Sequence, residues 1–86
     1  MDIVIGDLLT IEGEKYITLE KLTYENNDYI FVNKVIDENN LTEEFYIFKI
    51  VNNGIIIVES DNLRNILIPK FEELLKKDIN KILEEN

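Results

Sequence analysis

The sequence predicts an α+β protein, an antiparallel five-stranded β-meander followed by a C-terminal amphipathic helix. Turn residues recur at regular intervals between residues 7 and 60, and residues that favour strands fill the stretches between them. After Asn62 the apolar residues recur at spacings of three and four, which is the helical period. The chain has 86 residues, so we expect one domain, 1–86, with the meander in 7–60 and the helix in 61–84.

Turn chemistry places the boundaries of the strands. Gly13 can adopt the positive φ of a tight hairpin, and Asn53-Gly54 is the strongest short hairpin signal in the chain. The polar residues 25–28 form a second turn, and residues 37–42 form a longer connection. These connections are short, so neighbouring strands should pair antiparallel. The predicted strands cover 7–11, 15–24, 28–36, 43–51 and 55–59.

Apolar residues occupy both faces of the third predicted strand. This pattern is typical of a central strand in a strongly curved sheet, or of a sheet whose second face is covered by another element. One face carries Tyr29, Phe31 and Val35, and the other carries Ile30, Val32 and Ile36.

The C-terminal segment is predicted to be helical over about 62–84, with N-cap candidates in Ser60, Asp61 and Asn62. Pro69 lies inside this helix. Because proline lacks a backbone N–H and disfavours α geometry in the residue before it, we expect a kink near Pro69 or a short first helix ending near Ile68. The apolar stripe is expected to pack on the sheet through Phe71, Leu74 and Leu75.

The composition excludes several kinds of chemistry. The chain has no cysteine and no histidine, which removes thiolate chemistry, the commonest general base and the commonest transition-metal ligand. Its only serine is explained by capping, and the isolated glycines form no phosphate loop. Residues 37–48 do not form an EF-hand, because Leu41 stands where the third ligand belongs and Thr42 replaces the glycine. We therefore expect no enzymatic activity, no cofactor and no dedicated metal site.

The charge is concentrated in the predicted meander. The net charge is −9; residues 1–61 contain 13 acidic and 4 basic residues, whereas 62–86 contain five of each. Such a surface repels nucleic acids and anionic lipids and attracts basic proteins. The N-terminus lacks the features of a signal peptide, and the longest apolar run, residues 55–58, is too short to cross a membrane. We therefore expect a cytoplasmic protein that binds neither nucleic acid nor a membrane.

Several short segments carry a resemblance to a known group of proteins: Gly6–Ile11, Lys15–Ile17, Asp28–Val32, Glu44–Phe48 and Pro69–Leu75. Through these segments, residues 7–84 resemble small acidic proteins of Firmicutes and their phages, of the YrzB-like kind. The resemblance implies a β-meander followed by a helix and implies no particular activity.

The function that these observations favour is a non-enzymatic protein-binding domain with a basic partner. A sharper form is a phage-type inhibitor, an anti-CRISPR-like nucleic-acid mimic that occupies a basic groove. The alternative is a structural, homo-oligomeric domain of bacterial or phage origin, with a homodimer as its simplest form; an enzyme that uses carboxylates alone ranks last. The candidate binding residues lie mostly in the predicted connections. They are Asp37, Glu38, Glu43, Glu44, Glu12, Glu14 and Tyr46.

Overall fold

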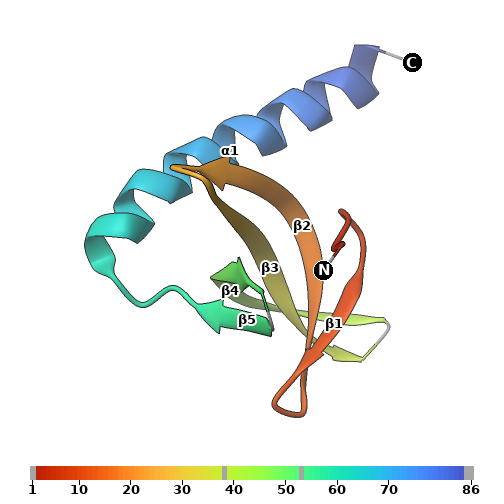
Figure 1. Cartoon of the computed structure of the whole chain (residues 1–86). Coiled ribbons are helices and arrows are strands. Elements are labelled where there is room, and N and C mark those ends of the chain that lie inside the picture. The colour runs from red at the N-terminus through yellow and green to blue at the C-terminus, as the bar shows by residue number, and fades with distance from the viewer. Residues whose placement is uncertain (1, 38, 53, 85–86) are drawn as a thin grey trace.

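A computed structural model describes residues 2–37, 39–52 and 54–84, with the backbone alone for 80–84. Within these residues, five antiparallel strands form one curled sheet in the order β1-β2-β3-β4-β5, and a helix follows (Figure 1). This arrangement confirms the predicted α+β meander. The elements are β1 (Leu8–Ile11), β2 (Glu14–Tyr24), β3 (Asn27–Asp37), β4 (Asn40–Val51), β5 (Gly54–Ile57) and α1 (Asp61–Glu84).

Two tight hairpins use residues with positive φ, which match the twist of the flanking strands. Gly13 has a φ of 81°, as predicted, and Glu12 before it has a φ of 50°. In the β2–β3 turn, Glu25 and Asn26 have φ values of 47° and 66°. The predicted Asn53-Gly54 hairpin includes Asn53, which lies outside the described residues; Gly54 is the first residue of β5.

The connection between β3 and β4 is shorter than predicted. β4 begins at Asn40, so residues 40–42 belong to a strand and not to a loop. The pairing of β3 with β4 shifts between Asn33 and Asp37, which lets β4 carry additional residues while remaining paired. β5 ends at Ile57, two residues earlier than predicted, although the Val58 amide still donates to the Ile47 carbonyl at 2.8 Å.

One hydrophobic cluster lies between α1 and the outer face of the sheet. Its buried members come from β3, β4, the segment after β5 and α1: they are Tyr29, Ile47, Val58, Leu67 and Phe71. The helix contributes Leu67 and Phe71 with 0% and 1% exposure, so these two side chains anchor α1 on the sheet. α1 therefore covers the face of β3 that carries Tyr29 and Phe31. Ile36, which was predicted to share the opposite face with Ile30 and Val32, is 70% exposed, because the pairing with β4 shifts beyond Asn33.

A second cluster fills the inside of the curl. It is formed by Ile3, Ile30, Val32 and Phe48, with partly buried side chains from β1 and β5 packed against it. Ile3 precedes the first strand and is 3% exposed, a core position that the strand pattern did not indicate. Both faces of β3 are therefore buried, one under a helix and one inside the curl.

α1 begins after Ser60, whose hydroxyl oxygen accepts a hydrogen bond from the Leu63 amide at 3.3 Å, as expected of an N-cap. The helix runs through Pro69 as one element, so no separate short helix ends near Ile68. The kink at Pro69 stays a prediction. Phe71 packs as predicted, while Leu74 and Leu75 are half-buried. The ammonium group of Lys70 lies 5.5 Å from the centre of the Tyr24 ring, where β2 ends beside the helix (Figure 1).

Candidate functional site

The meander brings two of its connections to one end of the sheet. In an antiparallel meander the β1–β2 and β3–β4 turns lie at the same end, and the pairing of Lys15 with Val35 places them side by side. We call residues 11–16 and 34–46, without Glu38, the hairpin end. Glu38, one of the predicted binding residues, lies outside the described part of the chain. The other six predicted residues are all located at the hairpin end: Glu12, Glu14, Asp37, Glu43, Glu44 and Tyr46.

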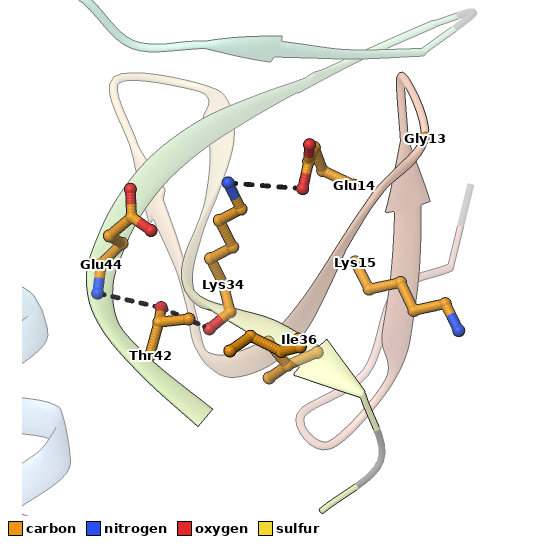
Figure 2. Close-up of a pocket in the computed structure, with 8 residues that line it drawn as sticks. Gly13, Glu14, Lys15, Lys34, Ile36, Thr42 and Glu44 are labelled. Carbon is orange, nitrogen blue, oxygen red and sulfur yellow. Dashed lines mark hydrogen bonds and ion pairs between the residues drawn. The ribbon is translucent and has the colours of Figure 1, made fainter. Parts of the chain in front are cut away.

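The hairpin end contains a hollow of about 390 Å³ between the β1–β2 turn and the start of β4. Its lining is mixed in charge, with two acidic and two basic side chains among polar and apolar groups. Figure 2 shows the Lys15 amine directed away from the pair formed by Lys34 and Glu14. The lining residues are Gly13, Glu14, Lys15, Lys34, Val35, Ile36, Thr42 and Glu44.

Lys34 lies among the carboxylates of this hollow. Its amine is 3.3 Å from a carboxylate oxygen of Glu14, and the two side chains are 27% and 53% exposed (Figure 2). The hydrogen bond and charge of Glu14, followed by the charge of Glu44, raise the pKa of Lys34 above its ordinary value. Lys34 therefore stays protonated at neutral pH and offsets part of the negative charge, so the hairpin end is less acidic than the positions of its carboxylates suggest.

Tyr46 is held by the same group of side chains. Its hydroxyl donates to Oε1 of Glu44 at 3.1 Å, and its ring packs edge-on against Tyr16 with 5.8 Å between the ring centres. The hydrogen bond to Glu44 is the main reason why the pKa of Tyr46 lies above its ordinary value. A phenol that stays protonated and donates to a carboxylate acts as a fixed donor at neutral pH.

Asp37 has a structural role in the β3–β4 turn. Its carboxylate accepts hydrogen bonds from the Asn39 amide at 2.9 Å and from the Asn40 side-chain amide at 2.9 and 2.8 Å. The bond from Asn39, supported by Asn40, lowers the pKa of Asp37. This carboxylate closes the tight turn that replaces the predicted loop, so changing it would alter the turn as well as the surface charge.

Asn33 organises the irregular start of β4 and was not singled out by the sequence. It is 3% exposed, and its side-chain amide donates to the carbonyls of Thr42 and Glu44 at 2.9 and 3.0 Å. The Thr42 hydroxyl donates to the Lys34 carbonyl at 2.7 Å and accepts from the Glu44 amide at 3.1 Å (Figure 2). These bonds satisfy backbone groups that the shifted pairing leaves without ladder partners. A polar residue in the middle of an apolar strand was the available signal.

Asn33→Ala is expected to lower the free energy of unfolding by about 1–3 kcal/mol, because the carbonyls of Thr42 and Glu44 lose the donor of two partly buried hydrogen bonds. Urea denaturation at neutral pH measures this effect. Asn65→Ala, at an exposed helical position, is the control and should be neutral or slightly stabilising. A cost for Asn33→Ala no larger than that of the control would contradict this role.

Exposed apolar side chains accompany the acids of the hairpin end. Ile36 and Leu41 are 70% and 66% exposed, and Phe45 is 48% exposed while it stacks on Phe31 with 5.6 Å between the ring centres. Apolar groups beside charged groups are typical of surfaces that contact other proteins. Within residues 2–37, 39–52 and 54–84, no three acidic side chains are grouped so that they could hold a metal ion.

No protein-family model matches the chain, and neither a curated protein nor a solved structure matches it. The resemblance to YrzB-like proteins therefore stays a prediction. In the part of the chain that the structure describes, no helix is long and apolar enough to cross a membrane.

Proposed function

We propose that the chain is a non-enzymatic protein-binding domain that contacts a basic partner through its hairpin end. One observation carries this proposal: the carboxylates of Glu12, Glu43 and Glu44 lie at the same end of the sheet as the exposed side chains of Ile36 and Leu41. Apolar contacts contribute affinity at protein interfaces, and charges around them steer the encounter and select the partner. A basic protein with a small apolar patch fits this combination.

The distribution of charge supports the same partner. The excess of acidic residues lies entirely in residues 1–61, the part of the chain that forms the sheet. The sharper form of the proposal is a phage-type acidic inhibitor, anti-CRISPR-like, that mimics nucleic acid in a basic groove of a cytoplasmic nucleic-acid-binding protein. Direct binding of the domain to nucleic acid is not part of the proposal, because the phosphates would meet a surface of like charge.

The alternative proposal is a structural homo-oligomer. The observation in its favour is that β1 and β5 each pair on one side only within the described residues, which leaves two open sheet edges. Light scattering over a range of concentrations tests it. A monomer at all concentrations up to the millimolar range would rule it out.

The test of the main proposal begins with capture of a partner from a bacterial or phage-infected lysate, with nuclease present so that nucleic acid cannot bridge the two proteins. The variant Glu43→Gln/Glu44→Gln removes two charges and keeps side-chain shape, including the oxygen that accepts from Tyr46. Asp37 is left intact because it closes the β3–β4 turn. The matched control, Glu25→Gln/Glu59→Gln, removes two exposed acids elsewhere on the chain.

The association rate of the hairpin-end variant is expected to fall about 3- to 10-fold at 0.1 M salt, since electrostatic steering accelerates association. The difference should disappear at 1 M salt, where the Debye length has fallen from about 10 Å to about 3 Å. Stopped-flow mixing with the captured partner measures both rates. Equal slowing by the control would show that overall charge is responsible, and no slowing at all would place the binding surface elsewhere.

A further inference from the structure

The curled sheet leaves a groove between its two edge strands. In the described residues, β1 pairs with β2 and β5 pairs with β4, and β1 and β5 do not pair with each other. A hollow of about 390 Å³ lies between them and shares only Glu14 with the lining of the hollow in Figure 2. Its apolar lining includes Ile11, Phe48, Ile55 and Ile57, and its acidic lining is Glu12 and Glu14.

The backbone of β5 presents hydrogen-bonding groups along the edge that faces away from β4. Val58 donates to Ile47 at 2.8 Å, and the antiparallel register pairs Ile57 with Phe48 and Ile55 with Ile50. Because bonded and non-bonded pairs alternate along an antiparallel ladder, Ile55 and Ile57 direct their N–H and C=O groups away from β4. These groups face the groove edge, where no described strand pairs with them.

The side chains around the groove define the chemistry of its occupant. An added strand would point alternate side chains toward Phe48, Ile55 and Ile57, which form an apolar surface. Glu12 and Glu14 line the same hollow and form its acidic rim. No basic residue lines this hollow, although Lys34 pairs with Glu14 from the neighbouring strand. The complement is an extended segment whose inward-facing side chains are apolar against Phe48, Ile55 and Ile57, with lysine or arginine at the inward-facing position nearest the rim.

From this geometry we propose that the groove binds an extended basic segment of a partner protein, which pairs with the free edge of β5 as a sixth strand. This inference rests on the proposed protein-binding function and names the form that the partner presents. β5 has four residues, so a segment of about five to seven residues spans the edge at roughly 3.3 Å per residue.

A second copy of the chain is a poorer occupant on grounds of charge. Each copy has a net charge of −9, and its own free edges are flanked by the same acidic rim. Pairing two such edges would bring like charges together, which costs association free energy and selects against self-assembly. A foreign basic strand meets the opposite charge at the same place.

The inference is tested on the full chain with capped seven-residue peptides. The lysine–valine probe is Lys-Thr-Val-Thr-Val-Thr-Lys, whose valines and terminal lysines point to the same face of an extended strand, and the matched peptide has glutamate in place of both lysines. Two further lysine–valine peptides carry N-methyl groups on the amides of the valines or of the threonines. Fluorescence anisotropy measures affinity, and amide hydrogen exchange locates the bound strand.

The lysine–valine peptide is expected to bind and to slow hydrogen exchange at Ile55 and Ile57. The glutamate peptide should bind at least about tenfold more weakly. One of the two N-methylated peptides should lose binding while the other retains it, since an added strand uses only alternate amides for pairing. Equal affinity of the lysine and glutamate peptides, equal loss with both methylated peptides, or slowed exchange outside β5 would each overturn the inference.

A matched pair of variants tests the side of β5 that is used. Ile57→Lys places a positively charged side chain in the groove and is expected to weaken binding of the lysine–valine peptide at least about tenfold. Ile56→Lys alters the neighbouring exposed isoleucine, which pairs with Lys49 and does not line the hollow, so binding should stay within about twofold. Equal effects of the two variants would overturn the inference. If Ile57→Lys fails to fold by circular dichroism, the methylated peptides and hydrogen exchange on the native chain decide.

The outcomes separate this inference from the proposed function. If no peptide binds up to millimolar concentration while Glu43→Gln/Glu44→Gln still slows association with a captured partner, the groove inference alone is overturned. If the peptides bind as expected while that variant leaves the association rate with a captured partner unchanged, the groove inference is supported and the role of the hairpin end is overturned. A dimer that competes with the peptide would show that a second copy is the occupant and overturn the inference.

Discussion

Phe71→Ala is expected to lower the free energy of unfolding by about 3–5 kcal/mol, the cost of removing a fully buried aromatic ring. Phe71 is 1% exposed, and its ring stacks on Phe31 with 5.5 Å between the ring centres. It belongs to the cluster that joins α1 to β3 and β4, so the cavity would open between the two layers of the fold. Urea denaturation followed by circular dichroism measures the change.

Ile66→Ala is the matched control for this prediction. Ile66 lies on the same helix but is 42% exposed, so its truncation leaves no internal cavity and should cost less than about 1 kcal/mol. Leu74, half-buried, should fall between the two. If Phe71→Ala and Ile66→Ala had similar midpoints of denaturation, α1 would not be packed on the sheet in solution.

Glu20→Gln is expected to stabilise the protein at pH 8 by about 2–3 kcal/mol and to leave its stability at pH 5 nearly unchanged. Glu20 is 3% exposed, faces α1 beside Phe31, and its Oε1 has no hydrogen-bond partner among the described residues. Burial, then the hydrogen bond to Asp78 and the charge of Asp78, raise the pKa of Glu20 to about 7, against a small lowering by the Lys21 amide.

The sign of the pH dependence follows from this raised pKa. The folded state holds the Glu20 proton more tightly than the unfolded state does, where the pKa is 4.5. The stabilisation is therefore fully present below pH 4.5 and is lost as the pH rises through about 7. At about 1.4 kcal/mol for each unit of pKa, the loss reaches up to about 3 kcal/mol.

Glutamine has nearly the shape of protonated glutamate and cannot ionise, so Glu20→Gln should remove this loss. Urea denaturation at pH 5 and pH 8 measures it, with Glu25→Gln, at an exposed turn position, as the control. Equal stabilisation by Glu20→Gln at the two pH values would show that ionisation of Glu20 does not limit stability.

The strands and helix could be located from sequence because their signals are local. Gly13 and the polar residues around Asn26 adopt the positive φ values that tight hairpins need, and such preferences act within two or three residues. The start of β4 could not be found in this way. It depends on the turn closed by Asp37 and on the bonds that Asn33 donates across to β4, which are contacts between different strands.

The candidate site was predicted in part, since acidic residues in connections can be recognised in any sequence. Their individual states needed the structure. Glu14 is paired with Lys34 and Glu44 accepts from Tyr46, so two of the predicted carboxylates already have partners within the chain. The groove beside β5 had no sequence signal. It exists because the curled sheet does not close, so that β1 and β5 do not pair with each other.

The sequence by itself determined the order and type of the elements, through turn residues and through the change from strand to helical spacing. Only the tertiary structure decided which side chains share a face. The pairing of β2 with β3 shifts between Thr18 and Glu20, so Thr18 pairs with Val32 inside the curl and Glu20 lies beside Phe31 under α1. Strict alternation would give these two residues one face. A bulge adds one residue and reverses the alternation beyond it, and its position is set by contacts across the sheet that no local pattern records.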